Sequence, residues 1–234
     1  MVSPLQKRLF ILLIMSFLLL FIIRYLFFHG DIVAAIKAST EEYKRTANMP
    51  VLVTVYYEAL CGDSKHFIIK QLLPAFKQAS PIMDVQLVPY GKAKTSTTLT
   101  GSYRFECQHG QTECEANMYH ACAIEAIQRA EDRINMVACM IHDNRRPREA
   151  LHNCAEQLGI DNTELIFKCF DSGHGIELLK FNGDETHALR PPVTFIPTVT
   201  LDGGQHLQTL ILKDLLGEVC KIIGKEERAK EFCY

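Results

Sequence analysis

The chain has 234 residues, of which 48% are hydrophobic and 22% are charged, and its formal net charge is −2. This is the composition of a folded globular protein, which excludes a disordered chain, and the near-neutral charge gives no electrostatic basis for nucleic-acid binding. Nine residues are cysteine, more than a reducing cytosol usually accommodates, and their odd number leaves at least one thiol unpaired.

The first thirty residues are predicted to be a targeting segment. Lys7 and Arg8 precede an apolar run over residues 9–23, which as a helix spans about 22 Å and suits the h-region of a signal peptide. If the run continues to Phe28, it spans about 30 Å and is long enough to cross a bilayer. In both interpretations the chain after residue 30 enters the lumen or the extracellular space. We therefore expect a signal peptide or an uncleaved type II signal anchor over residues 1–30, with the anchor slightly favoured, and no other membrane contact.

A stem or linker is predicted over residues 31–50, and the pattern of a βαβ unit follows it. Residues 51–57 form a continuous run of β-branched and aromatic side chains, which predicts a buried strand. Apolar residues then recur at helical spacing over residues 67–76, with Pro74 as a kink or a last-turn marker. Residues 83–88 alternate between apolar and polar side chains, which predicts a second strand parallel to the first.

Residues from 92 to 180 have a different character, with helical patterns and six of the nine cysteines. Gly159 is a suitable end for one helix. Residues 161–164 (Asp-Asn-Thr-Glu) resemble a capping box at the start of the next helix. The sequence therefore predicts a helical insert over this region.

Strand character returns over residues 193–201, and the Asp-Gly-Gly turn at 202–204 predicts a β-hairpin. A final helix with one apolar face is predicted over residues 210–223. The order over residues 51–234 is that of a thioredoxin-like α/β fold (βαβ, then ββα) interrupted by a disulfide-rich helical insert. In such folds a cis-proline lies against the reactive sulfur, and Pro197 stands where that proline is expected.

Cys61 is the strongest candidate for chemistry. It follows the strand at 51–57 and precedes a helix, so that backbone N–H groups and the positive end of the helix dipole point at its sulfur. Lys65 and His66 add favourable charge, whereas Asp63 opposes it. This arrangement favours a nucleophilic thiolate. The alternative, that Cys61 is half of a structural disulfide, is weaker because its position and the odd cysteine count agree.

Ser64 stands where a dithiol oxidoreductase has its second cysteine. That second thiol normally resolves the mixed disulfide formed after the first cysteine attacks a substrate. Ser64 cannot do so, although its hydroxyl can hydrogen-bond the Cys61 thiolate or cap the helix. Resolution would then need free cysteine, glutathione or a thiol from elsewhere in the chain, and no bound cofactor is expected.

The segment from Cys107 to Cys122 carries the most specific pattern: Cys-Gln-His-Gly, two residues, Glu-Cys, two residues, Asn, four residues and Cys. It resembles the signature of the gamma-interferon-inducible lysosomal thiol reductase (GILT) family at every fixed position. Residues 57–61 also resemble the family's active-site strand, and residues 195–199 resemble its proline strand. The likeness therefore spans residues 50–233.

The resemblance implies a thioredoxin-like fold with a helical insert. It also implies the reduction of disulfide-bonded protein substrates in endosomes or lysosomes, linked to host defence. Cys61 takes the place of the family's nucleophile, with Ser64 and Pro197 as the other two site residues. Ser64 departs from the family's usual dithiol, because this chain has Cys-x-x-Ser where Cys-x-x-Cys is expected.

The remaining cysteines are expected to form structural disulfides. Cys114 and Cys122 lie about 12 Å apart along one predicted helix, too far to bond each other. Cys220 and Cys233 flank the C-terminal segment and can pair locally, but the sequence does not choose among the other connectivities. The eight candidates are Cys107, Cys114, Cys122, Cys139, Cys154, Cys169, Cys220 and Cys233.

No metal is expected. Cys107, His109 and Cys114 offer zinc ligands, but their spacing fits no familiar tetrahedral module, and an oxidising lumen favours disulfides. The sequence has no Asn-x-Ser/Thr sequon, so a glycan cannot direct this chain to lysosomes.

Two alternatives stay open. In the first, the chain is a catalytically weak or inactive protein that holds client proteins in mixed disulfides through Cys61. In the second, it is a saposin-like lipid binder built on the helical insert. The lipid-binding alternative is weaker because it leaves the strands and Pro197 unexplained.

Overall fold

The computed structural model describes residues 15–22, 24–25, 49–161, 163–224, 227 and 229–233. The chain divides into two units, Met1–Met49 and Pro50–Tyr234. Described residues before Met49 are helical and exposed. Most of the predicted targeting segment and nearly all of the stem lie outside the described residues. Within the described ranges, no helix is both long and apolar enough to cross a membrane.

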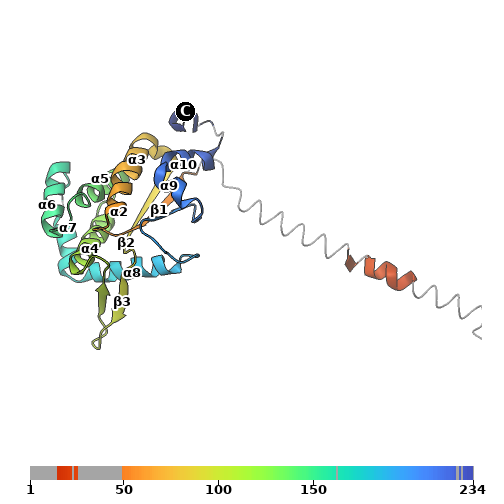
Figure 1. Ribbon diagram of the computed structural model, residues 1–234, viewed down its shortest axis with the longest axis horizontal. Helices are drawn as coiled ribbons and strands as arrows, with labels where there is room; N and C mark the ends of the chain where they lie inside the picture. The colour runs from red at the N-terminus through yellow and green to blue at the C-terminus, as the bar shows by residue number, and fades with distance from the viewer. Residues whose placement is uncertain are drawn as a thin grey trace, which may run out of the picture. The chain divides into compact units, whose positions relative to one another are not determined.

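A three-stranded sheet forms the centre of the second unit (Figure 1). The strands are β1 (Val51–Tyr57), β2 (Met83–Pro89) and β5 (Thr198–Leu201), in the order β2-β1-β5. β1 pairs in parallel with β2 and antiparallel with β5. Because β1 is the middle strand, all of its side chains except that of Leu52 are buried, as the continuous apolar run predicted.

The crossover from β1 to β2 is helical, which confirms the predicted βαβ unit. It consists of α2 (Gly62–Phe67), the π-helical turn η1 (Ile68–Leu72), α3 (Leu73–Ala79) and the 3-10 turn η2 (Ser80–Ile82). The widened turn η1 ends just before Pro74, which has no N–H for the helical ladder. The helix therefore changes its hydrogen-bonding pattern near Pro74 and continues beyond it.

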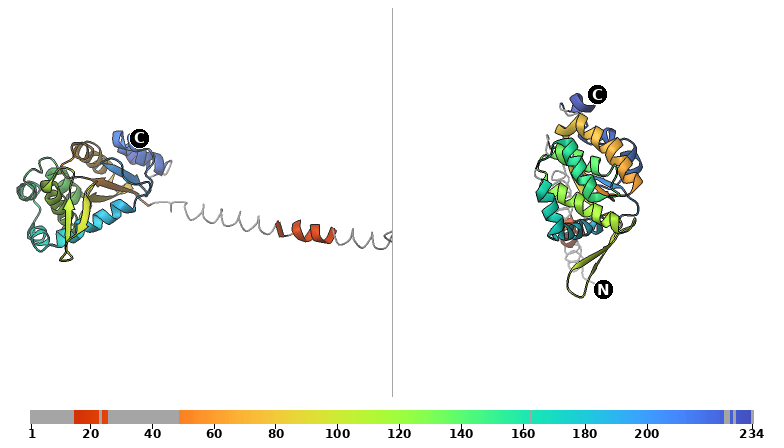
Figure 2. Two further views of the ribbon diagram at one scale, coloured as in Figure 1. Left: turned by 60° about the horizontal axis from the view of Figure 1, so that its bottom comes forward. Right: turned by 90° about the vertical axis from the view of Figure 1, so that its left-hand side faces the viewer.

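The insert begins with a β-hairpin, so the prediction of a purely helical insert was wrong at its start. Strands β3 (Lys94–Thr97) and β4 (Tyr103–Glu106) pair antiparallel and project beyond the helices (Figure 2). Five helices follow: α4 (Gln111–Ala126), α5 (Ala130–Met140), α6 (Pro147–Leu158), α7 (Thr163–Asp171) and α8 (His174–Ala188). Gly159 ends α6 with a left-handed φ of 63°, as predicted, because glycine adopts this conformation without a Cβ clash.

The hairpin predicted over residues 193–204 was also wrong. Only Thr198–Leu201 form a strand, and beyond the turn a single bridge joins Leu201 to Gly204. Pro191 and Pro192 directly precede the predicted strand, and Pro197 lies within it and removes one N–H donor from its ladder.

The predicted final helix is divided into two. These are α9 (Gln208–Lys213) and α10 (Leu215–Ile223), and α11 (Ala229–Cys233) follows them. Asp214 interrupts the helix, because its backbone is non-helical and its Oδ1 accepts a hydrogen bond from the Gly217 N–H at 2.9 Å. An aspartate is favourable in this N-cap role.

Within the described residues, three apolar cores support the unit, and the smallest of them contains Tyr90, Phe105 and Leu179. The first lies around the sheet, with α3 and α10 on one side and α8 on the opposite side of the sheet (Figures 1 and 2). The second lies inside the insert, and its fully buried members are Tyr119, Cys122, Ala123, Met136, Met140 and Leu151. The insert therefore has a core of its own, which holds α4 in a fixed position relative to the end of β1.

Candidate functional site

Cys61 lies between the end of β1 and the start of α2. It is the N-cap residue of α2, and its extended backbone (φ −72°, ψ 126°) directs the chain into the helix. Its N–H donates to the Glu58 carbonyl at 3.2 Å, and its own carbonyl accepts from the Lys65 N–H at 3.0 Å. All nine cysteines are among the described residues, and Cys61 alone is outside a disulfide, with its side chain half-buried.

The loop before β5 brings Ile196 and Pro197 to the Cys61 sulfur. The peptide bond between these two residues is cis, the isomer implied by the resemblance to thioredoxin-like folds. The Sγ of Cys61 lies 3.9 Å from the Ile196 carbonyl oxygen, within reach of a weak S–H donor. The structure thus places two of the three predicted site residues together, although 136 positions separate Cys61 from Pro197 in the chain.

Ser64 lies one turn into α2 and is fully buried. Its hydroxyl oxygen accepts a hydrogen bond from the Glu58 N–H at 3.3 Å. The sequence predicted that the Ser64 hydroxyl would hydrogen-bond the Cys61 thiolate or cap the helix. Instead, α2 has no side-chain cap, and Ser64 hydrogen-bonds the backbone of the preceding loop. Ser64 therefore supports the segment that carries Cys61 and has no thiol with which to attack it.

The other eight cysteines form four disulfides, Cys107–Cys114, Cys122–Cys169, Cys139–Cys154 and Cys220–Cys233. Cys114 and Cys122 pair with other residues, consistent with their separation along α4. The bond between Cys107 and Cys114 removes both sulfur ligands of the zinc site considered from sequence. Three of the four disulfides join residues within the insert, and Cys61 is a free cysteine.

Three residues contact the chain just before Cys61: Asn117 and His120 on α4, and Asn144 after α5. The Oδ1 of Asn117 accepts from the Ala59 N–H at 2.9 Å. The Nδ1 of His120 lies 2.8 Å from the Tyr57 hydroxyl, and its Nε2 lies 2.6 Å from the Nδ2 of Asn144. Burial lowers the pKa of His120 to about 3, so this ring stays neutral even at mildly acidic pH.

Sequence reasoning assigned His120 no role and treated the signature as a disulfide framework. The missed signal is spacing: Glu113, Asn117 and His120 recur at intervals of four and three residues. Such residues share one face of a helix. The structure turns this polar face toward the end of β1, so the signature also positions the loop that leads to Cys61.

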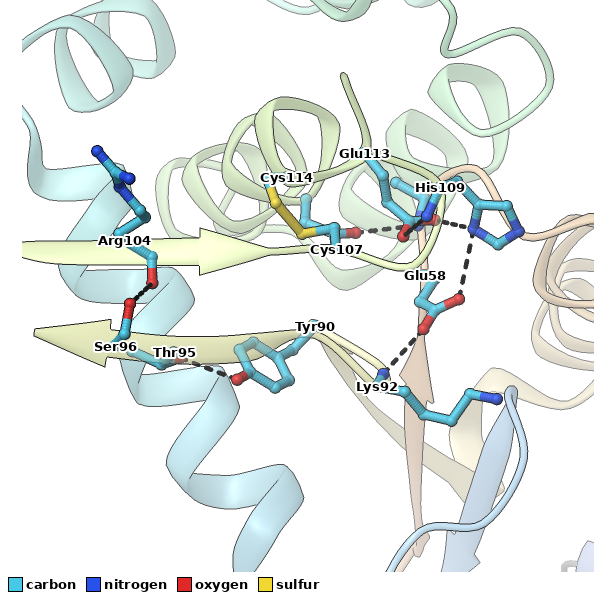
Figure 3. The surroundings of a disulfide bond; sticks show 12 residues. Glu58, Tyr90, Lys92, Thr95, Ser96, Arg104, Cys107, His109, Glu113 and Cys114 are labelled. Carbon is cyan, nitrogen blue, oxygen red and sulfur yellow. Dashed lines mark hydrogen bonds and ion pairs between the residues drawn. A yellow bond between two sulfur atoms is a disulfide. The ribbon is translucent and has the colours of Figure 1, made fainter. Parts of the chain in front are cut away.

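Glu58, Glu113 and His109 form a second polar cluster (Figure 3). Both carboxylates are buried, and the Nδ1 of His109 lies 2.6 Å from Glu113 and 3.6 Å from Glu58. The Lys92 N–H donates to the Oε1 of Glu58 at 2.8 Å. Burial, with the nearby Glu113 carboxylate, raises the pKa of Glu58 above its ordinary value, although the Lys92 N–H opposes the shift.

The raised pKa of Glu58 predicts a pH-dependent stability. Because the folded state binds the Glu58 proton more tightly than the unfolded state, this contribution is present at low pH and is lost as pH rises through the folded pKa. We expect Glu58→Gln to gain stability relative to the parent between about pH 4 and about pH 7, since glutamine can still accept the Lys92 N–H. Urea unfolding midpoints at both pH values measure this difference.

Glu156→Gln is the matched control, because Glu156 is exposed on α6. Its midpoint relative to the parent should change little over the same pH range. A Glu58→Gln midpoint that differs from the parent by the same amount at both pH values would contradict the assignment of a raised pKa to Glu58.

Comparisons with known proteins agree with this geometry. Residues 52–158 match the sequence family described as gamma interferon inducible lysosomal thiol reductase (GILT). A gamma-interferon-inducible lysosomal thiol reductase-like protein of Anopheles gambiae is 35% identical over 189 residues, which cover 75% of this chain and 78% of that protein. The gamma-interferon-inducible lysosomal thiol reductase of Carassius auratus is 34% identical, over 77% of this chain and 71% of that protein.

Solved structures support the fold. DsbA of Chlamydia trachomatis superposes with a TM-score of 0.53 at 15% identity, covering 74% of this chain and 85% of that one. Reduced DsbA of Mycobacterium tuberculosis superposes with a TM-score of 0.52 at 15% identity, covering 80% and 93%. The predicted fold class, a thioredoxin-like fold with a disulfide-rich helical insert, is confirmed, with a hairpin added at the start of the insert.

Proposed function

Because this chain belongs to the gamma-interferon-inducible lysosomal thiol reductase family, we propose that it reduces disulfide bonds in proteins with Cys61 as its single nucleophile. One observation carries the proposal: Cys61, the only one of the nine described cysteines outside a disulfide, occupies the N-cap position of α2 with its Sγ 3.9 Å from the Ile196 carbonyl oxygen at the cis-proline. In this position the side chain of Cys61 is half-buried and borders an open pocket.

The first step is an exchange of disulfide bonds. The Cys61 thiolate attacks one sulfur of a substrate disulfide, a bond forms between Cys61 and that sulfur, and the second substrate sulfur leaves as a thiolate that takes up a proton. Ser64 has no thiol for the second step, so an external thiol attacks the mixed disulfide. Over a full cycle two thiols are oxidised to one disulfide and the substrate disulfide is reduced to two thiols.

We place this reaction in the lumen of the secretory pathway, in endosomes, lysosomes or the extracellular space. Four disulfides are expected only where the surroundings are oxidising. The apolar segment at the N-terminus supplies the route of entry, and its cleavage or retention as an anchor stays a prediction. A link to host defence follows from the family resemblance alone.

The test is the reduction of a disulfide-bonded protein by the full chain at mildly acidic pH, with free cysteine as the reductant. We expect a rate well above that of cysteine alone, followed by the appearance of two substrate thiols per cycle. Stoichiometric capture of the substrate without turnover would favour a client-binding protein, and no capture and no acceleration would exclude Cys61 as the nucleophile.

Ser64→Cys is expected to raise turnover when the external thiol is weak or dilute. The new sulfur would be held next to Cys61, and an intramolecular thiol outcompetes a millimolar external one by roughly tenfold or more. The measurement is the turnover rate as a function of glutathione concentration, for the variant and the parent.

Ser96→Cys controls for the simple addition of a thiol, because Ser96 is exposed on β3, far along the chain from the active-site loop. This control should behave as the parent does. An equal turnover of Ser64→Cys and parent at low glutathione would show that resolution does not limit the cycle.

A further inference from the structure

An open pocket of about 370 Å³ lies beside Cys61. One wall is the active-site loop and the start of α2, including Leu60, Cys61 and Lys65. The other wall is the segment after α5, residues 141–145. Pockets of this size hold small molecules, and a molecule in this one would contact the residue that carries the mixed disulfide.

Three charged side chains line the pocket. The Nζ of Lys65 donates to the His142 carbonyl at 2.5 Å, which draws the lysine across the pocket to the opposite wall. The guanidinium of Arg145 makes two hydrogen bonds of 2.9 Å to the carboxylate of Asp143. These bonds lower the pKa of Asp143, so it stays ionised in an acidic compartment. The pocket is therefore lined by two cationic side chains and one anionic side chain.

Asn144 lies in the same wall, and its amide group is buried. Its side chain is 2% exposed, and its Nδ2 faces His120 and the Ala59 carbonyl. Its Oδ1 has no hydrogen-bond partner in the described part of the chain. Because this oxygen is itself buried, a molecule in the pocket would meet the charged side chains of Asp143 and Arg145 and not the amide of Asn144.

We propose that this pocket binds the external thiol that regenerates Cys61, and that it selects thiols with an amino-acid end. The α-carboxylate of such a thiol would bind Lys65 and Arg145, and its α-ammonium would bind Asp143. Free cysteine and glutathione share this chemistry. The inference rests on the proposed function, because only a protein that forms a mixed disulfide at Cys61 needs this second reactant.

Two bound thiols act in turn in each cycle. The first, as a thiolate, attacks the Cys61 sulfur, and the substrate sulfur leaves as a thiolate that takes up a proton. A second thiolate attacks the resulting mixed disulfide between Cys61 and the small thiol. Cys61 is released as a thiolate, and the two small thiols leave joined as one disulfide, so atoms and electrons balance.

The test starts from Cys61 in a mixed disulfide with a neutral fluorescent peptide that carries one cysteine. Release of the peptide after addition of a thiol is followed by fluorescence anisotropy. The thiols are cysteine, glutathione, cysteamine (ammonium alone), 3-mercaptopropionate (carboxylate alone) and 2-mercaptoethanol (neither). Each rate is divided by the rate of the same thiol with a free peptide disulfide, which corrects for intrinsic reactivity.

We expect the cysteine rate to saturate with concentration and the 2-mercaptoethanol rate to stay linear. Arg145→Gln should lower the ratio of the cysteine rate to the 2-mercaptoethanol rate by roughly tenfold, the effect of one lost charge-assisted hydrogen bond. Lys65→Met should lower the same ratio. Arg146→Gln is the matched control, because Arg146 pairs with Glu149 at 2.8 Å and does not line this pocket.

The two natural thiols are distinguished by the same assay, because the better reductant is the one that saturates at the lower concentration. A cysteine rate that is linear and no faster than that of 2-mercaptoethanol, after correction, would overturn the pocket and leave Cys61 chemistry intact. No release of peptide by any thiol would overturn the proposed function itself.

Discussion

Replacing Cys61 by alanine is expected to reduce thiol-driven disulfide reduction to the rate of the reductant alone, a loss of at least roughly a thousandfold. Cys61 is the one thiol left outside a disulfide among the nine cysteines, all of them described, so no other sulfur can take over the attack. The measurement is the initial rate of reduction of a disulfide-bonded protein with saturating cysteine.

Cys61→Ser is the companion variant, because it keeps the size of the side chain and loses only the nucleophile. It should be as inactive as Cys61→Ala, while both unfold at the urea midpoint of the parent. Activity within a few-fold of the parent in either folded variant would mean that the reaction does not pass through Cys61.

The second large effect concerns stability. The Cys122–Cys169 bond joins α4 to α7 across 47 positions of the chain, and Cys122 is fully buried in the core of the insert. In the chain-entropy account a bridge of this length stabilises the fold by about 4 kcal/mol. We therefore expect the double variant Cys122→Ala, Cys169→Ala to lose about 4 kcal/mol in the free energy of unfolding, measured by urea denaturation.

The double variant Cys220→Ala, Cys233→Ala is the control for bridge length. Its bond closes 13 positions between α10 and α11, and the same account gives it about 3 kcal/mol. The bridge in the insert also holds α4, which carries Asn117 and His120 against the active-site loop. Its loss should therefore reduce turnover as well, and an equal loss of stability and activity in both variants would contradict this account.

The sequence predicted the parts of the fold in which local pattern and burial agree. β1, the helix after Cys61 and β2 were predicted because strong apolar periodicity covers each of them. The hairpin of β3 and β4 was missed, since its strands have four residues each and only Phe105 among them is buried. An exposed hairpin of this length leaves no hydrophobic alternation in the sequence to detect.

The candidate site, like the fold, could be predicted from the sequence only in part. Cys61 was located by its place between a strand and a helix, and Pro197 by analogy of fold, and the structure brings the two together. Their catalytic roles, with that of Ser64, stay predictions. The contacts of Asn117 and His120 with the active-site loop depend on how the insert packs on β1, and a polar side chain in a sequence does not show which partner it will meet.

The central claim is that Cys61 works without a second thiol in the chain. The most direct measurement is peptide mapping by mass spectrometry, after incubating the full chain with a disulfide-bonded protein and no small thiol, then quenching with acid and alkylating. We predict a mixed disulfide between Cys61 and the substrate, one free substrate thiol and four unchanged disulfides. A reduced substrate with two free thiols, together with Cys61 in a new disulfide within this chain, would contradict the account.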